Sequence, residues 1–578
     1  MEGMKVKVAS TAGFCMGVRR AVNLALDAAR DQPGPVTTLG PLIHNPQVVE
    51  LLQNRGVVSA ASPPDRGVVV IRSHGIPPAL RDELGARGLP VVDATCPRVA
   101  RVHGIVRSQR KRDALIVVLG DAGHAEVLGI VGAAAGAAVL VSGPDDVTNL
   151  PDAARVCLVA QTTQDRERFL ATAEAVRRRY GALPAEDVVI ADTICDSTRS
   201  RQEEVKRLAR EVEAVVVVGG RESANTRRLA ELAAAEGAPA FLAETEADLD
   251  PAVMARFRVV GLTAGASTPN WMIRRVYYEL RRMGPPVSAF SWLRDAVRWL
   301  VLSNLYVAVG AGAMTYAAAR LQGFSPLWRE ALVSLLYAFS VHTMTALADR
   351  DALELSEPAR AKAFGRRRGA WHAAGIGAAV AAAAICFSLG LVSGAAFVLL
   401  AVASLLYPVR LLRGREWKLP FRSLAEVPGG KDFFMAIGWA AVTVALPLIN
   451  RPDRPERAPA VAVAFALVFG LVFCRALLRD FRDLQADRMV GRETLPIIFG
   501  VQSSRRLLFG GMAGTAAALV AATAAGVVAA PTGYLLVLPF AYAAACVPLF
   551  TRQAVVQGFR AEMIADFVFV LAGLVAAI

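Results

Sequence analysis

Three cysteines occupy matching positions in the first half of the chain. Cys15, Cys96 and Cys195 each follow a short apolar run, stand in a polar turn and precede a helical pattern. They lie too far apart in sequence for a local zinc knuckle or a CxxC redox pair. They could meet only if three similar units face one centre, and three converging thiolates would form a metal site.

The sequence leaves the identity of this metal open. Three thiolates on a 4Fe–4S cluster leave one iron without a protein ligand and open to a substrate. A zinc ion held by three cysteines would need a fourth ligand, which His74 or His124 could supply. Alternatively, the three cysteines are buried structural residues, although three in matched positions make this less expected. Four further cysteines are expected in the apolar core: Cys157, Cys386, Cys474 and Cys546.

Other polar side chains of the same half suit an anionic substrate. Histidines can donate hydrogen bonds to phosphate oxygens, and serine or asparagine at a helix N-terminus accompanies backbone N–H groups that favour phosphate. One such residue is as often a helix cap or a core residue, but several in one crevice favour a diphosphate. The residues are His44, His74, His124, Ser223, Asn225 and Ser267.

Glu126 is a candidate general acid. It stands two residues after His124 and is the carboxylate of these loops with an adjacent proton donor. The alternative is a glutamate in a first helical turn, where the helix dipole favours a negative charge.

Short β-branched runs alternate with helical patterns, which predicts parallel sheets covered by helices. In such sheets ligands bind at the carboxyl ends of the strands, where these polar loops fall. Neither G-x-G-x-x-G nor G-x-x-x-x-G-K-[ST] occurs, which disfavours a nicotinamide-dependent enzyme or a P-loop ATPase. The predicted strands are 5–9, 67–71, 90–96, 114–119, 155–160, 187–191, 214–218 and 258–262.

About residues 4–280 resemble the 4-hydroxy-3-methylbut-2-enyl diphosphate reductase (LytB/IspH) family. The resemblance implies a three-lobed α/β enzyme around a 4Fe–4S cluster. Such enzymes use two electrons and two protons to remove an allylic hydroxyl as water, giving isopentenyl and dimethylallyl diphosphate. The resemblance rests on the motifs Gly13-Phe14-Cys15-x-Gly17-Val18, His44-Asn45, Ser73-His74-Gly75, Asp93-Ala94-Thr95-Cys96-Pro97, Gly123-His124-x-Glu126, Gln161-Thr162-Thr163, Asp192-Thr193-Ile194-Cys195, Ser223-x-Asn225 and Ala264-Gly265-Ala266-Ser267.

The resemblance also implies a role for each residue. Cys15, Cys96 and Cys195 would hold the cluster, and Glu126 with Thr162 would relay a proton to the leaving hydroxyl. An electron donor such as a ferredoxin or flavodoxin is implied. A redox-sensing iron–sulfur module without turnover is a rival, but a sensor needs no diphosphate cradle. That cradle would comprise His44, His74, Ser223, Ala224, Asn225 and Ser267, with His124 helping to hold the substrate. Ala224 departs from members with a second serine there, but its backbone N–H can still donate.

The second half of the chain predicts an integral membrane domain. The 578-residue chain is 54% hydrophobic, and from about Trp299 apolar runs of membrane-spanning length repeat to the C-terminus. The predicted organisation is a reductase domain at 1–283, a linker at 284–298 and about nine transmembrane helices at 299–578. The net charge of +14 reflects basic loops at 349–369, 410–431 and 479–506, which favours positive-inside topology over nucleic-acid binding. Because the first ten residues lack a signal peptide's apolar core, the reductase domain is expected in the cytoplasm.

An acidic cluster marks one of these loops. Asp480, Asp483 and Asp487 are spaced to share one helix face. Carboxylates at a membrane helix end suit Mg²⁺ bridging a diphosphate, although a solvated charged helix end has the same spacing. Asp349 is a weaker counterpart.

With the sequel 491–496, this cluster resembles the second acidic motif of UbiA-type intramembrane prenyltransferases. That family uses Mg²⁺ to ionise a prenyl diphosphate and alkylate a lipophilic acceptor, so the resemblance implies Mg²⁺ at Asp349, Asp483 and Asp487. The first motif departs, because Thr345 stands where the family usually has asparagine. The rival interpretation is a catalytically inactive membrane anchor.

Overall fold

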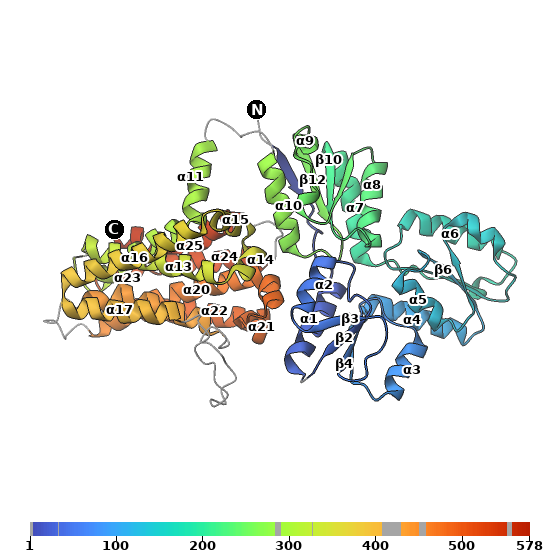
Figure 1. Ribbon diagram of the computed structural model, residues 1–578, viewed down its shortest axis with the longest axis horizontal. Coiled ribbons are helices and arrows are strands. Elements are labelled where there is room, and N and C mark those ends of the chain that lie inside the picture. The colour runs from blue at the N-terminus through green and yellow to red at the C-terminus, as the bar shows by residue number, and fades with distance from the viewer. Residues whose placement is uncertain are drawn as a thin grey trace. The chain divides into compact units, whose positions relative to one another are not determined.

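The chain folds into two compact units, Met1–Ser288 and Ala289–Ile578 (Figure 1). The computed structural model describes residues 4–32, 34–283, 291–325, 327–406, 429–449, 458–551 and 558–578. The predicted linker at 284–298 lies partly outside these residues, as does most of the basic loop at 410–431. From Ser291 the linker is already helical, in α11 (Ser291–Leu302).

The first unit contains three four-stranded parallel sheets, which confirms the three-lobed α/β prediction. Their neighbouring strands are β1 (Lys5–Val8), β12 (Val259–Ala264), β10 (Ala214–Val218) and β11 (Ala240–Ala243) in the first sheet; β5 (Val91–Asp93), β4 (Val68–Ile71), β2 (Val36–Leu39) and β3 (Val57–Ala60) in the second; and β9 (Val188–Ile190), β8 (Val156–Ala160), β6 (Leu115–Leu119) and β7 (Ala138–Val141) in the third.

The three sheets share one topology. In each, the strand that leads to a cysteine is an edge strand, and the strand beside it leads to a loop with predicted substrate residues. The first sheet is completed by the beginning of the chain, and Figure 1 shows β1, in dark blue, next to the green strands β12 and β10. A chain segment far away in sequence therefore places Cys15 in the same setting as Cys96 and Cys195.

The inner strands β4, β6, β8 and β10 are continuous apolar runs, as expected for sheets with helices on both faces. All residues of β4, β8 and β10 are buried. The covering helices are α1 (Met16–Asp31), α2 (Pro46–Gln53), α3 (Pro78–Ala86), α4 (Pro97–Arg110), α5 (Ala125–Ala133), α6 (Arg166–Arg179), α7 (Asp196–Arg210), α8 (Ala224–Ala235), α9 (Pro251–Met254) and α10 (Asn270–Met283).

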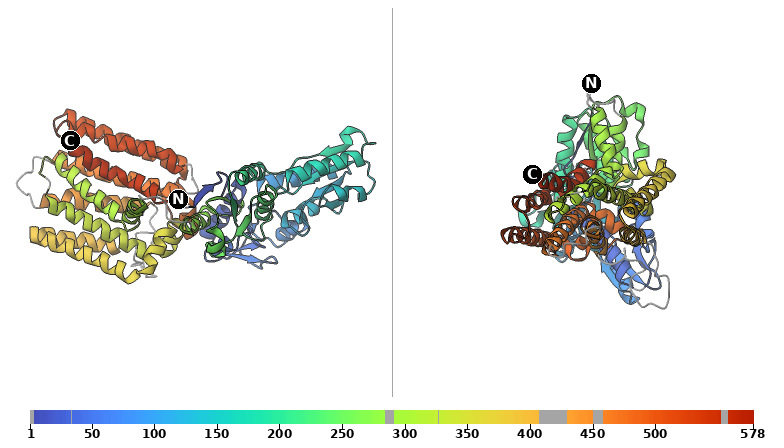
Figure 2. Two further views of the ribbon diagram at one scale, coloured as in Figure 1. Left: turned by 90° about the horizontal axis from the view of Figure 1, so that it is seen from above. Right: turned by 90° about the vertical axis from the view of Figure 1, so that its left-hand side faces the viewer.

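The second unit is helical, and its long helices run side by side in Figure 2. Its remaining helices are α12 (Leu305–Leu321), α13 (Trp328–Ala348), α14 (Arg350–Ser356), α15 (Pro358–Arg366), α16 (Arg368–Leu389), α17 (Leu391–Leu406), α18 (Gly430–Ala440), α19 (Leu446–Ile449), α20 (Ala458–Val490), α21 (Leu495–Ile498), α22 (Gly500–Ala524), α23 (Thr532–Leu535), α24 (Leu538–Thr551) and α25 (Gly558–Ala576).

The predicted count of nine spans is not met among the described residues. Six helical segments are long and apolar enough to cross a membrane, or seven if the bent pair α11–α12 counts as one span. Helix α17 has 16 residues, and α25 carries Arg560, Glu562 and Asp566 in its first half. Both helices form at predicted apolar runs, but neither has the length and low charge of the six segments.

Candidate functional site

Each of the three cysteines caps the N-terminus of a helix at the carboxyl edge of its sheet. Cys15 precedes α1, Cys96 precedes α4 and Cys195 precedes α7. All three side chains are partly exposed, whereas the other four cysteines are buried as predicted. The Cys15 sulfur also accepts a hydrogen bond from the Val18 N–H at 3.4 Å.

The backbone of each cysteine is bonded to the loop of the neighbouring strand. The N–H groups of Cys15, Cys96 and Cys195 donate to the carbonyls of Ala266, Ser73 and Thr162 at 3.1, 2.9 and 3.0 Å. Those carbonyls belong to, or directly precede, predicted substrate residues: Ser267, His74 and Thr162 itself. In every lobe, one hydrogen bond therefore fixes a cysteine beside a residue of the predicted substrate pocket.

Three arginines link the cysteine loops in a cycle. Arg201 on α7 donates to the Gly13 carbonyl of the Cys15 loop at 2.6 Å. Arg20 on α1 donates to the Thr95 carbonyl of the Cys96 loop at 3.0 Å. Arg98 on α4 closes the cycle through an ion pair with Asp196, next to Cys195.

The links of this cycle differ in burial and therefore in how much each one stabilises the fold. The Arg98–Asp196 pair is 42% and 66% exposed, so it stabilises the fold by about 1 kcal/mol at most. Arg201 is buried, and the loss of a buried cation's partner costs more. Burial lowers the pKa of Arg201, and the nearby Cys15 and Cys195 charges oppose that shift. Arg201 is therefore a cation beside two of the three thiols.

The three thiols are near enough for their charges to act on one another. Burial raises the pKa of Cys96, and the charges of Cys15 and Cys195 raise it further.

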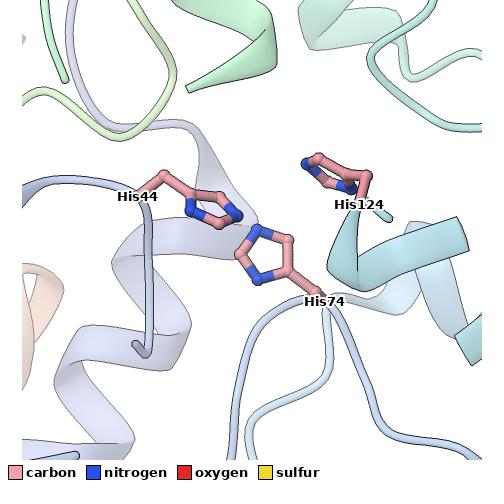
Figure 3. Close-up of side chains that lie close together, drawn as sticks. All are labelled: His44, His74 and His124. Carbon is pink, nitrogen blue, oxygen red and sulfur yellow. The ribbon is translucent and has the colours of Figure 1, made fainter. Parts of the chain in front are cut away.

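His44, His74 and His124 meet in one pocket, as the sequence predicted (Figure 3). Their ring centroids are 4.6 to 5.6 Å apart. His44 follows β2, His74 follows β4, and His124 caps α5 after β6, so two lobes contribute. This set could hold a metal ion by its spacing, or it could donate hydrogen bonds to an anion.

These histidines are neutral near pH 7. Burial is the main cause that lowers the pKa of each, to about 4 for His124 and well below its ordinary value for His74. The His124 Nδ1 atom accepts a hydrogen bond from the Glu126 N–H at 3.2 Å. Its proton therefore sits on Nε2, which becomes a donor.

Several buried nitrogen atoms of this pocket have no hydrogen-bond partner within the described part of the chain. They are His44 Nε2, His74 Nδ1 and Asn225 Nδ2. Buried polar atoms are rarely left unpaired, so these atoms indicate a polar ligand. The Ser267 hydroxyl donates to the His44 carbonyl at 3.1 Å. Ser223 caps α8, whose first residue is Ala224, so the helix N-terminus carries the predicted anion ligands.

Glu126 is buried in the same lobe and bonded to Thr162. Its two carboxylate oxygens accept from the Thr162 N–H at 2.7 Å and the Thr162 hydroxyl at 2.9 Å. Burial raises the pKa of Glu126 to about 7, although the two hydrogen bonds lower it. A carboxyl group that exchanges its proton near neutral pH can serve as a general acid.

Of the predicted metal ligands of the second unit, only Asp349 lines the polar cavity found there. Asp349 ends α13 and lines this cavity with His342 and Thr345. Asp483 and Asp487 lie buried on α20. Arg492 contacts both Asp349 and Asp487, whereas Asp483 pairs with Arg482.

The first unit has close relatives among curated proteins. Residues 6–281 match the LytB protein family model. The chain is 38% identical over 294 residues to 4-hydroxy-3-methylbut-2-enyl diphosphate reductase of Opitutus terrae, covering 48% of this chain and all of the relative. It is 41% identical over 286 residues to that of an Anaeromyxobacter species, covering 49% and 99%. The chain belongs to the 4-hydroxy-3-methylbut-2-enyl diphosphate reductase family. A solved reductase from Plasmodium falciparum is 24% identical, with a TM-score of 0.46, covering 48% of this chain and 88% of that one.

The reductase domain is followed by a second family match. Residues 305–572 match the UbiA prenyltransferase family model. The chain is therefore a reductase of this family whose second half is similar to UbiA prenyltransferases, as the acidic motif at 480–496 indicated.

Sequence reasoning missed the residues that hold the cysteine loops together. Arg20, Arg98 and Arg201 were not singled out, because each acts on a loop of another lobe. Gly17 was noted only as part of a motif, yet a Cβ there would lie 2.5 Å from the Cys96 sulfur. The signal available was position: all four residues lie within one or two turns of a cysteine.

We expect Gly17→Ala to displace the Cys96 sulfur and to lower the iron content of anaerobically purified protein by several-fold, because the added methyl group overlaps that atom. The control is Gly104→Ala on α4, where a Cβ would meet no atom within 4 Å. Full iron occupancy in Gly17→Ala would show that the Cys96 sulfur is not a cluster ligand in this position.

Proposed function

We propose that the first unit reduces 4-hydroxy-3-methylbut-2-enyl diphosphate to isopentenyl and dimethylallyl diphosphate. The observation that carries this proposal is the repeated bond from a cysteine N–H to a substrate loop. It brings three thiols and a polar pocket to one centre. The family relationship supports the same reaction, and the reactive pocket supplies the donors that a diphosphate needs.

Cys15, Cys96 and Cys195 are proposed to hold a 4Fe–4S cluster. When bound, the cluster would pass on two electrons, one at a time, from an external donor and would offer an iron to the substrate hydroxyl. Arg201 offsets the negative charge of the thiolates and fixes the Cys15 loop through the Gly13 carbonyl. The charges of Cys15 and Cys195 act on Cys96, which supports one shared site for the three thiols.

The diphosphate is proposed to lie among the unpaired donors of the pocket. His44, His74, Ser223, Asn225 and Ser267 contribute side chains, and Ala224 contributes its N–H at the start of α8. An arriving anion would raise the pKa of the nearby histidines, which strengthens their hydrogen bonds. His124, with its proton on Nε2, is placed to hold the substrate hydroxyl.

Glu126 and Thr162 are proposed to deliver the proton that turns the hydroxyl into water. The protonated Glu126 carboxyl donates to the Thr162 hydroxyl, which passes its own proton on. Because Glu126 has a pKa of about 7, this acid is present below pH 7 and is lost as the pH rises through 7.

The reductase rate of the wild type is therefore expected to fall as the pH rises above about 7. Glu126→Gln should lower kcat by about a hundredfold or more and remove this alkaline limb. Product formation is measured anaerobically with a chemical reductant, and the control is Glu203→Gln on the exposed face of α7. An unchanged limb near pH 7 in Glu126→Gln would assign the proton to another group.

The second unit is proposed to be a Mg²⁺-dependent prenyltransferase. It would bind a longer prenyl diphosphate and a lipophilic acceptor in the membrane. Asp349 lines a polar cavity whose empty volume is about 660 Å³ including space open to solvent, and Asp487 contacts Arg492, which also lines it. The basic loops favour a cytoplasmic reductase domain, and a ferredoxin or flavodoxin is proposed to supply its electrons there.

The paired change Asp483→Ala and Asp487→Ala is expected to reduce prenyl transfer in membranes by about a hundredfold or more, because both charges would act on the metal. Transfer is followed as radiolabel moving from a prenyl diphosphate into extractable lipid. Cys15→Ser is the matched control, since it should abolish reduction and leave prenyl transfer intact. Unaltered labelling in the aspartate variant would contradict the proposed transfer at these aspartates and favour the inactive anchor.

A further inference from the structure

Arg492 joins the two acidic motifs of the membrane domain. It lies in the turn after α20, where its Nε atom contacts the Asp349 carboxylate at 3.1 Å and Nη2 contacts the same group. Its Nη1 atom contacts the Asp487 carboxylate at 3.2 Å. One guanidinium therefore bridges two carboxylates that come from different helices.

The surroundings of this bridge are rich in cations. Three anionic side chains line the cavity, against five cationic ones: Arg360, Arg475, Arg479, Arg492 and Lys431. Arg360, Arg475 and Arg479 already have buried acidic partners, namely Glu357, Glu562 and Asp566. Arg492 is different, because its partners Asp349 and Asp487 are the carboxylates predicted to bind a metal ion.

Charge balance opposes a divalent ion that enters alone. The bridge has one positive and two negative charges. A divalent ion on both carboxylates would neutralise them and take both of these ion-pair partners from the partly buried Arg492. Such a loss is costly, although Asp432 still acts on Arg492. An anion that arrives with the ion provides the missing counter-charge, and a guanidinium pairs well with phosphate oxygens.

We propose that Arg492 is a positioning residue that competes with the divalent ion for Asp349 and Asp487 and moves to the diphosphate when that ligand binds. The proposal rests on the diphosphate-binding function proposed for this unit. It makes the binding of ion and anion mutually dependent. The site then stays closed to free divalent ions and takes up the ion together with its anionic ligand.

The test uses Mn²⁺ and inorganic pyrophosphate with the full chain in detergent. Protein-bound Mn²⁺ is counted by equilibrium dialysis, with and without pyrophosphate. In the wild type, pyrophosphate should increase Mn²⁺ affinity by about tenfold or more, and Mn²⁺ should increase pyrophosphate affinity by the same factor. Pyrophosphate also binds Mn²⁺ in solution and so lowers the concentration of free Mn²⁺. An increase in protein-bound Mn²⁺ can therefore arise only if the ion and pyrophosphate bind the protein together.

Arg492→Gln is expected to bind Mn²⁺ alone about tenfold more tightly than the wild type and to lose most of the coupling. Arg492→Lys should be intermediate, because a single ammonium cannot bridge both carboxylates as a planar guanidinium does. The matched control is Arg505→Gln, which removes a positive charge from the exposed face of α22 and should behave as the wild type.

Equal Mn²⁺ affinity in the wild type, Arg492→Gln and Arg492→Lys would overturn the proposal, as would the absence of coupling in the wild type. Elution volume and melting temperature show whether each variant is folded. If Arg492→Gln does not fold, Arg492→Lys, which keeps the positive charge, still tests the proposal. Strong coupling without any prenyl transfer would support the role of Arg492 while contradicting the transferase function.

Discussion

The bond from each cysteine N–H to the neighbouring loop is the constraint on which the reductase site depends. Parallel strands end at the same edge of a sheet, so an edge strand that leads to a cysteine ends beside the loop of the next strand. The chain repeats this arrangement in three lobes. In one of them the edge strand is β1, which pairs with β12 from the other end of the reductase domain. Cysteines and substrate residues are therefore fixed together, and moving one loop moves both parts of the site.

Burial shifts the pKa values of the histidines and of Glu126 in opposite directions. It disfavours charge, so it lowers the pKa of the three histidines and raises that of Glu126. The free pocket thus holds neutral donors and a carboxyl group that exchanges its proton near pH 7. The buried Arg201 supplies a fixed positive charge near the thiols, while the exposed Arg98–Asp196 pair contributes little. Substrate charge is then added to a site where the cations Arg72 and Arg227 and the carboxylates of Asp121 and Glu222 all act on the histidines.

The sequence predicted what is local and periodic. The strands that lead to Cys15, Cys96 and Cys195 were found, as were the histidine loops and the acidic motif on α20. The strands β2, β3, β7 and β11 were not among those predicted; a segment such as Val36-Thr37-Thr38-Leu39 mixes apolar and polar residues without regular alternation. The arginine cycle and the Arg492 bridge were missed for a different reason: each depends on contacts between residues far apart in sequence. Whether an apolar run spans a membrane also depended on its exact helix length and on charges such as Glu562.

The central claim is that three cysteines from three lobes hold one redox cluster. The most direct measurement is the iron and acid-labile sulfide content of anaerobically purified wild type and Cys195→Ser, with reductase activity measured on the same samples. The account predicts equal iron and sulfide in an active wild type, and loss of both sulfide and activity in Cys195→Ser, whose serine oxygen is a poor substitute for thiolate. An active protein without iron, or one zinc ion bound in place of iron, would contradict it.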